Sequence, residues 1–281
     1  MRDKSVAQTF RPACFAALPP SRVALRRAGK RCATFVFLIA AVACNTFLGP
    51  APIDRNWHVH DGPHVSFYVR PGSFAEQNAG RLSEVAEDQF AATVAALRLT
   101  YAGRVRAYAY NSAADADFEF TYSGRGYPET EAFRFVCVAP LGDNLFGLMS
   151  HEANHVFIIG SLGRAGTFFI TEGLATALLS ETFHRAGRHF LFPWTRANRA
   201  QLPSLSKLVD DGEWGKVPSQ VAYNTSASFL AWLLDTYGPD PLRQIYAASS
   251  EEFRDRFAAA YGRSLEALEA EWLRFTETFS G

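Results

Sequence analysis

The feature that most limits how this chain can fold is a polar motif set inside an apolar, helix-forming segment. His151, Glu152 and His155 form the pattern H-E-x-x-H. The apolar residues around them are Leu145, Phe146, Leu148, Met149, Val156, Phe157 and Ile158. On an α-helix each residue advances about 100°, so the two histidines lie about 40° apart on one face. Imidazoles and a carboxylate on such a helix are costly to bury without partners, so the fold must bring a partner to this face.

Glu172 is the candidate for that partner. Residues 160–166 carry three glycines, which predicts a reversal between two helices. The second helix then runs back past the first and presents Glu172 to the two histidines. Gly173 has no side chain, so we expect it to let the backbones of these two helices approach closely.

The resulting set of side chains has the composition of a catalytic zinc site. Such sites use three protein ligands and keep one position open. His151, His155 and Glu172 would be the ligands for Zn²⁺. Glu152 would lie beside the metal without binding it and would accept a proton from the activated water.

The same residues resemble those of a known family. The H-E-x-x-H motif followed by Thr171-Glu172-Gly173-Leu174-Ala175 resembles the gluzincin branch of zinc metallopeptidases, and more narrowly the small bacterial peptidase-MA-like domains. The likeness continues in residues 223–230, 235–238, 261–266 and 268–272. It implies an α+β, zincin-like fold: a small N-terminal sheet with a helix, the H-E-x-x-H active-site helix and a C-terminal helical lobe. It also implies hydrolysis of peptide bonds in a peptide or protein substrate, with Glu152 as the general base.

The resemblance suggests roles for three further parts of the chain. Tyr223 lies where this group often has a Tyr or His, so it is a candidate donor to the developing oxyanion. The alternative is an ordinary tyrosine of the core or its rim. Thermolysin-type enzymes carry an Asp four residues after the ligand glutamate, and here that place holds Thr176. The strand before the motif helix, residues 133–138, is expected at the edge of the sheet, where it can pair with an extended peptide.

Two other functional classes stay open from the sequence. One is a non-catalytic zinc-binding protein of the cell envelope, although a purely structural site would have no need of Glu152 as a base. The other is a zinc hydrolase that acts on a non-peptide amide or ester, because the motif does not distinguish among these substrates.

The N-terminal residues have the form of an export signal. Residues 1–43 hold eight Lys or Arg and one acidic residue, and they end in an apolar run, residues 33–43. Residues 41–43 with Cys44 resemble a bacterial lipobox, so we expect a lipoprotein attached to the membrane through a lipid on Cys44. Cleaved secretion and an uncleaved anchor are the alternatives.

The rest of the chain has 20 basic and 27 acidic residues, a net charge of −7. Nothing in this distribution indicates a nucleic-acid surface.

Periodicity divides the remainder into a linker, residues 44–63, and one domain, residues 64–281. Strands are predicted at residues 64–70, 104–110 and 133–138. Helices are predicted at residues 74–99, around the H-E-x-x-H motif, from the Glu172 motif to about 183, and at 204–210, 221–237, 241–248, 251–261 and 264–279. Residues 111–128, 191–203 and 211–215 are predicted to be mainly irregular. We assign residues 64–142 to a sheet part and 143–281 to the metal helices and a helical lobe.

Two groups of metal-binding residue types receive simpler interpretations. His58, His60 and His64 lie close together, but a surface strand or tether is favoured over a second metal site. Cys137 alternates with apolar residues of a predicted strand, so we expect a buried thiol without a disulfide partner.

Overall fold

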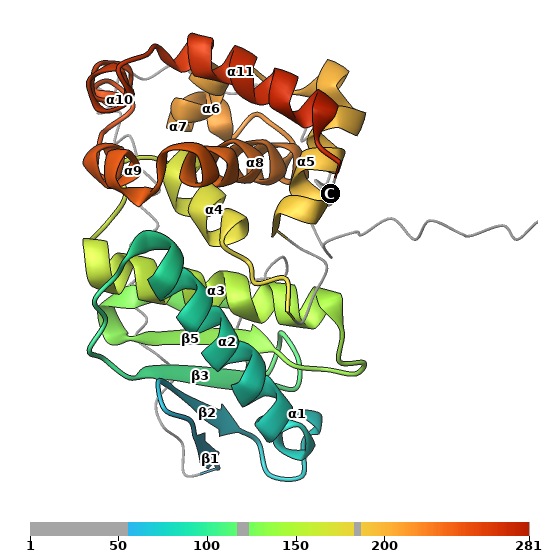
Figure 1. Ribbon diagram of the computed structural model, residues 1–281. Helices are drawn as coiled ribbons and strands as arrows, with labels where there is room; N and C mark the ends of the chain where they lie inside the picture. Colours follow the sequence, from blue (N-terminus) through green and yellow to red (C-terminus); the bar gives the residue numbers. More distant parts are fainter. Residues whose placement is uncertain (1–55, 117–123, 183–186, 281) are drawn as a thin grey trace, which may run out of the picture.

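A computed structural model describes residues 56–116, 124–182 and 187–280. The predicted signal, Cys44 and the first part of the predicted linker lie outside these residues. The elements follow in the order β1 (His58–Asp61), β2 (Val65–Val69), α1 (Phe74–Gln77), α2 (Ala79–Leu97), β3 (Val105–Tyr110), β4 (Gly124–Tyr127), η1 (Pro128–Thr130), β5 (Ala132–Val136), α3 (Asp143–Leu162), α4 (Phe168–Ala177), α5 (Gly187–Asn198), η2 (Arg199–Gln201), α6 (Leu205–Val209), α7 (Asp211–Trp214), α8 (Ser219–Tyr237), α9 (Pro239–Ile245), α10 (Phe253–Tyr261) and α11 (Leu265–Thr278). The fold is therefore mixed α/β, with a small sheet followed by helices (Figure 1).

The five strands form one sheet in the order β1-β2-β3-β5-β4. The central strands β2, β3 and β5 run parallel, and β1 and β4 pair antiparallel at the two ends. In Figure 1 the β5 side of the sheet lies toward the C-terminal helices and β1 lies farthest from them. This arrangement puts one end of the sheet beside the helices that follow it.

Helices α2 and α3 pack on the same face of the sheet. Alternate residues of the strands, among them Val65, Phe67 and Val69, face this side because side chains alternate along a strand. They share a core with apolar residues of both helices: Leu82, Val85, Ala86, Phe90, Met149, Ala153, Val156 and Phe157. We call β1–β5 with α1, α2 and α3 the sheet lobe, because α3 packs with the sheet.

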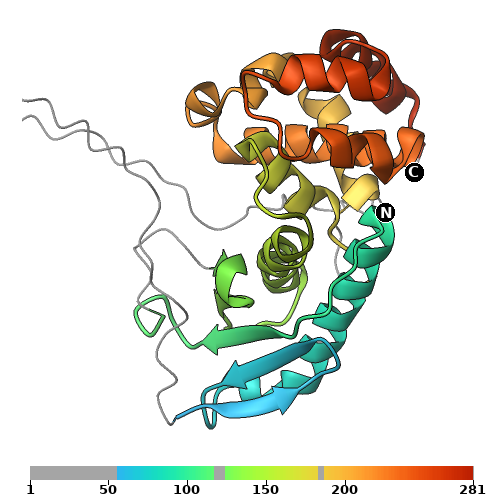
Figure 2. The ribbon, with the colours of Figure 1, turned by 90° about the vertical axis from the view of Figure 1, so that its left-hand side faces the viewer.

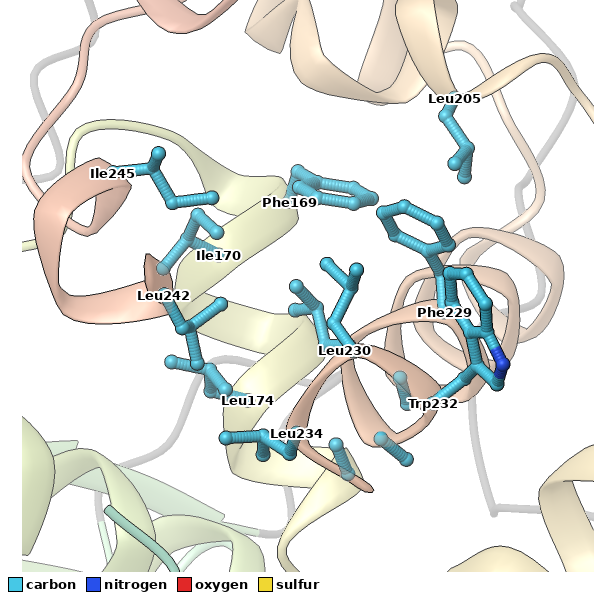
Figure 3. Close-up of a cluster of buried hydrophobic side chains, with 14 of the residues drawn as sticks. Phe169, Ile170, Leu174, Leu205, Phe229, Leu230, Trp232, Leu234, Leu242 and Ile245 are labelled. Atoms are coloured by element: carbon cyan, nitrogen blue, oxygen red, sulfur yellow. The ribbon is translucent and has the colours of Figure 1, made fainter. Parts of the chain in front are cut away.

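Helices α4 to α11 form a second core, which we call the helical lobe. Helix α8 runs through its centre, and α4 packs closely against α8 (Figure 3). Gly173 allows this approach, because a Cβ there would lie 2.7 Å from Leu230 and 2.9 Å from Ser226. The expectation that Gly173 serves the contact between the two metal helices is therefore wrong, since the helix it meets is α8.

The two lobes meet where α4 packs on α3, which lies between the sheet and α4 (Figure 2). Gln89 of α2 contacts Leu178 and Ser180, just after α4. We call this region, including residues 178–180 just after α4, the seam. Within the described residues no helix is long and apolar enough to cross a membrane.

The edge of the sheet differs from the prediction. The strand predicted at residues 133–138 is β5, which lies between β3 and β4 and is not an edge. The edge is β4, in a segment predicted to be irregular. Its sequence Gly-Arg-Gly-Tyr has low strand propensity, so only its pairing with β5 reveals it.

Several helix boundaries also differ from those predicted. Residues 191–203 were predicted irregular, yet α5 covers residues 187–198 with Pro193 inside it, because Leu191 and Phe192 are buried in the helical lobe. Residues 211–215 contain one helical turn, α7, which Asp210 caps. The predicted helix at residues 74–99 is divided into α1 and α2. The helix with Glu172 ends at Ala177 rather than near residue 183.

Candidate metal centre

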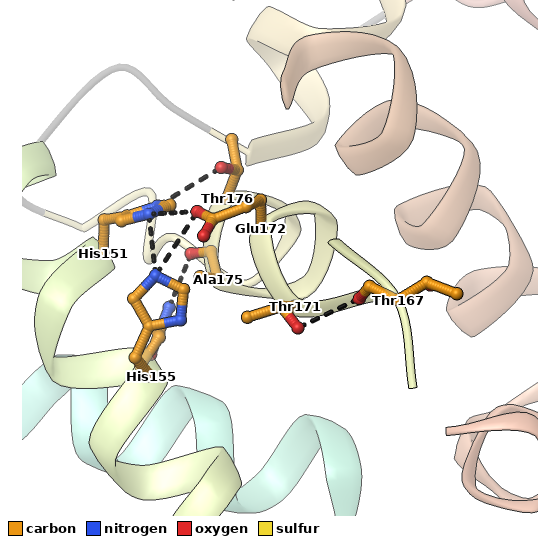
Figure 4. Close-up of polar contacts among 8 residues, drawn as sticks. His151, His155, Thr167, Thr171, Glu172, Ala175 and Thr176 are labelled. Atoms are coloured by element: carbon orange, nitrogen blue, oxygen red, sulfur yellow. Dashed lines mark hydrogen bonds and ion pairs between the residues drawn. The ribbon is translucent and has the colours of Figure 1, made fainter. Parts of the chain in front are cut away.

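Helix α3 carries the H-E-x-x-H motif with its apolar side on the sheet. Asp143 lies in its first turn, where the helix dipole favours a carboxylate, and Gly163 ends it with a φ of 80°. Because the apolar side is occupied by the sheet, His151 and His155 lie on the side that faces α4 (Figure 4). Both imidazoles are partly buried, with 15% and 12% of their side-chain surface exposed.

Residues of the helical lobe contact the turn between α3 and α4 and fix its position. A Cβ on Gly166 would lie 2.0 Å from the carbonyl oxygen of Ala248, so only glycine fits there. The hydroxyl of Tyr246 donates to the carbonyl of Gly163 at 2.9 Å. Thr167 then caps α4 by accepting from the amide of Ile170. These contacts start α4 in a direction that carries Glu172 to the histidines.

His151, His155 and Glu172 meet as predicted. Nε2 of His151 lies 3.1 Å from Oε2 of Glu172 and 3.1 Å from Nε2 of His155. Nε2 of His155 lies 3.4 Å from the same carboxylate oxygen. Within the described residues this is the one cluster of three His, Cys, Asp or Glu side chains whose ligand atoms all lie within 4.8 Å of one another. The three side chains therefore form a candidate metal site.

The pKa values of Glu172 and His155 are shifted by each other's charge. Burial alone would raise the pKa of Glu172, but the charge of His155 and hydrogen bonds from both histidines hold that pKa well below its usual range. Burial alone would lower the pKa of His155, and the charges of Glu172 and Glu152 raise it instead. The carboxylate of Glu172 is thus ionised and available as a ligand.

Glu152 lies beside the cluster but outside it. Its residue surface is 9% exposed, and burial raises the pKa of its carboxyl despite the opposing charges of His151 and His155. Strand β4 covers it: a Cβ on Gly124 would lie 2.8 Å from Cγ of Glu152, and the backbone N–H of Gly126 bonds its carboxylate. The two glycines let the strand approach the helix closely enough to hold this side chain.

Thr176 contacts His151, one of the three residues of the candidate metal site. Its hydroxyl lies 3.3 Å from Nδ1 of His151 (Figure 4). A hydrogen bond donated by Nδ1 leaves Nε2 of the same ring available for a metal. The sequence marked this position only as a departure from a family pattern, whereas the structure shows what the threonine contacts.

Tyr223 is close to the cluster. Its ring stacks on that of His151, with centroids 5.8 Å apart and 28° between the planes. Trp214 of α7 packs on Tyr223, with the two ring centroids 5.9 Å apart. Tyr223 of α8 and Trp214 of α7 therefore lie as two packed aromatic rings beside His151.

The N-terminal histidines do not assemble a second site among the described residues. His58 pairs with Glu76, and His64 pairs with Glu87 at 2.7 Å while stacking on Phe90. His60 lies on the exposed edge strand β1. Elsewhere, Cys137 is buried, as predicted.

Sequence reasoning missed Gly124 and Gly126 as parts of the site. The two glycines alternate within a polar stretch, and that spacing of two is the signal for a strand with one side against another backbone. No protein-family model matches the chain, and no curated protein matches it.

Proposed function

We propose that the chain is a zinc-dependent metallopeptidase with a zincin-like fold, in which His151, His155 and Glu172 hold the ion. The observation that carries this proposal is the spacing of the three ligand atoms. With bonds of 2.0–2.1 Å, neighbouring ligand atoms of a tetrahedral zinc lie about 3.3 Å apart. The separations found among the two Nε2 atoms and Oε2 are 3.1, 3.1 and 3.4 Å. Two imidazoles and one carboxylate are also a donor set of catalytic zinc.

Glu152 is the general base of the proposed reaction. When bound, zinc supplies Lewis-acid chemistry, because it makes water acidic enough to lose a proton near neutral pH and polarises a carbonyl group. Glu152 takes that proton and later passes it to the leaving amine. Its position beside the cluster, its burial and the bond from Gly126 support this role, since a base must be held in one orientation.

Tyr223 is the proposed donor to the carbonyl oxygen on which negative charge develops. The stacking of its ring on that of His151 supports this role. Tyrosine is suited to this work because it combines an apolar ring that packs with a hydroxyl that donates.

Strand β4 supports a peptide as the substrate. Among the described residues it pairs with β5 alone, so its other edge is not paired with a strand. An extended peptide can add to such an edge through backbone hydrogen bonds, which require no particular side chain. Because Gly124 and Gly126 touch Glu152 and His155, a peptide on this edge would lie near the base.

Export belongs to the proposal as well. The basic and apolar N-terminal residues with Cys44 favour a lipoprotein of the cell envelope. Replacing Cys44 with Ser should release the protein from the membrane fraction, and unchanged detergent-requiring association would exclude Cys44 as the anchor.

The test combines metal analysis with digestion of a diverse peptide pool by the full chain and by Glu152→Gln. The wild type should hold one zinc and cleave peptides. Glu152→Gln keeps the size of the side chain and removes the proton acceptor, so turnover should fall by about 10²–10⁴-fold while zinc content stays at the wild-type level. The matched control is Glu84→Gln, which changes an exposed glutamate of α2 and should alter neither.

Each result has a distinct meaning. A wild-type chain that holds zinc but cleaves no peptide would favour a non-catalytic zinc protein or a hydrolase of other amides or esters. Turnover of Glu152→Gln at the wild-type rate would exclude the proposed base.

A further inference from the structure

A buried group of amides and hydroxyls joins three helices at the seam. Gln89 and Thr93 come from α2 and Asn154 comes from α3, and all three side chains are fully buried. Their partners on and after α4 include backbone groups of Ala175, Leu178 and Ser180. None of these contacts takes part in the proposed chemistry.

Asn154 makes the central contacts. Its Nδ2 donates to the carbonyl of Ala175 on α4 at 2.9 Å. Its Oδ1 accepts from Nε2 of Gln89 at 2.9 Å and from Oγ1 of Thr93 at 2.6 Å. One amide therefore ties α3 to α4 while two side chains of α2 hold that amide in orientation.

Gln89 makes a second connection to the same helix. Its Nε2 lies 2.7 Å from the carbonyl of Leu178, and its Oε1 accepts from the amide of Ser180 at 2.9 Å. The same Nε2 lies 2.9 Å from Oγ1 of Thr93 and 2.9 Å from Oδ1 of Asn154, so two hydrogens are shared among three acceptors. We call Gln89, Thr93 and Asn154 the seam amide network.

The network lies directly beside the metal ligands. Asn154 precedes the ligand His155 on α3, and its acceptor Ala175 comes one turn after Glu172 on α4 (Figure 4). Only one residue on α3 and one helical turn on α4 therefore separate the bond between Asn154 and Ala175 from His155 and Glu172.

Apolar packing alone would not fix that position. Ile170, Leu174 and Ala177 of α4 belong to the core of the helical lobe, whereas most of the buried apolar residues of α3 belong to the core of the sheet lobe. Apolar burial is non-directional, but hydrogen bonds hold their atoms within a narrow range of distance and angle. A slip of α4 by one residue would move Glu172 by about 1.5 Å and 100°, while metal ligands tolerate about 0.2 Å.

We propose that the seam amide network is a positioning device that holds Glu172 opposite His151 and His155 before metal binds. Asn154 acts through the backbone of α4, so it is a positioning residue rather than a ligand. This inference rests on the proposed zinc binding.

The experiment measures zinc affinity of the full-length protein by competition with a chromophoric chelator, at a temperature where circular dichroism shows native helix content. Asn154→Ala should weaken zinc binding by at least about tenfold, the lower end of the range for groups that orient metal ligands. Thr93→Val keeps the branched shape, removes one bond to Asn154 and should weaken binding in the same direction by less. With Co²⁺ in place of zinc, both variants should show an altered visible absorption spectrum, since it reports the ligand geometry.

Ser228→Ala is the matched control. Ser228 is also fully buried, and its Oγ accepts from Thr195 at 2.7 Å and from Nε1 of Trp272 at 3.1 Å, inside the helical lobe. This variant should lower Tm while zinc affinity and the Co²⁺ spectrum stay as in the wild type.

The outcomes separate the two proposals. Zinc affinity of Asn154→Ala and Thr93→Val equal to the wild type would overturn the positioning role, as would an equal loss in Ser228→Ala. A folded wild-type protein without zinc affinity would overturn the proposed function and this inference with it. Should Asn154→Ala fail to fold, the milder Thr93→Val decides the matter by itself.

Discussion

The interior of the helical lobe and the seam are both buried, yet they are filled by different kinds of side chain. In the helical lobe aromatic rings pack edge to face or stacked, as Phe169, Phe229 and Phe253 do. At the seam imidazoles, carboxylates and amides lie beside buried apolar residues such as Ile158 and Leu178. The helical lobe is thus held mainly by apolar area, whereas the seam adds a group of directional polar contacts to its apolar packing.

This difference separates the residues that stabilise the fold from those that position the groups of the proposed chemistry. Apolar burial stabilises in proportion to the area removed from water and tolerates small shifts. Polar contacts add less net free energy but fix atoms within tenths of an ångström. A metal site whose proposed ligands come from two lobes needs the second property, so changes in the two regions should have separable effects.

The largest effect on stability should come from Phe229→Ala in the helical lobe. Phe229 is fully buried between aromatic neighbours, so its loss leaves a cavity and should cost about 3–5 kcal/mol of unfolding free energy. Urea unfolding of the metal-free protein measures this cost. Val59→Ala, at a position that is 50% exposed, is the control and should change it by less than about 0.5 kcal/mol. The comparison breaks if the folded Phe229→Ala protein loses zinc affinity as strongly as a ligand variant does.

Glu172→Ala at the seam should act on the metal rather than on the fold. It removes one of three proposed ligands, so zinc affinity should fall by more than the about 10–100-fold that loss of an outer partner costs. Isothermal titration with zinc measures the change. Replacement of the exposed Glu251 by Ala should leave zinc affinity unchanged, and full zinc occupancy of Glu172→Ala would show that the third ligand is another residue.

Gly124→Ala should separate catalysis from metal binding. The added methyl group would meet Cγ of Glu152 at 2.8 Å and Leu148 at 2.9 Å, so the proposed base must move. Displacement of a catalytic group by about 1 Å can cost about 10²-fold in rate. Peptide hydrolysis should fall by about this factor with zinc content unchanged. Gly142→Ala is matched, because nothing lies within 4 Å of its Cβ position, and it should keep full activity.

The smallest effect should come from a surface contact between the lobes. Arg98 and Asp240 pair at 3.1 Å, with 65% and 69% of their side-chain surface exposed. Because solvent screens such a pair, Asp240→Asn should cost at most about 1 kcal/mol in thermal unfolding. A larger loss would mean that surface charge, and not the seam, holds the lobes together.

Local patterns in the sequence determined the elements that depend on neighbouring residues. The spacing of His151 and His155 follows from one helical turn, and the alternation at residues 64–70, 104–110 and 133–138 follows from the pleat of a strand. The C-terminal helices carry their own apolar stripes, so their existence was predicted and only their ends shifted. The cluster of His151, His155 and Glu172 was predicted because two of its members are local to one helix and the third follows a glycine-rich reversal.

Tertiary structure alone decided what surrounds those elements. Strand β4 is made by its pairing with β5, and Gly124 and Gly126 acquire a role only because Glu152 lies against them. Gly173 allows α4 to approach α8 closely. Helix α5 continues through Pro193 because its apolar residues are buried in the helical lobe. The physical reason is the same in each case: a glycine, a proline or a buried amide such as Asn154 is explained by the backbone that approaches it from elsewhere in the chain, and no local period of the sequence records that approach.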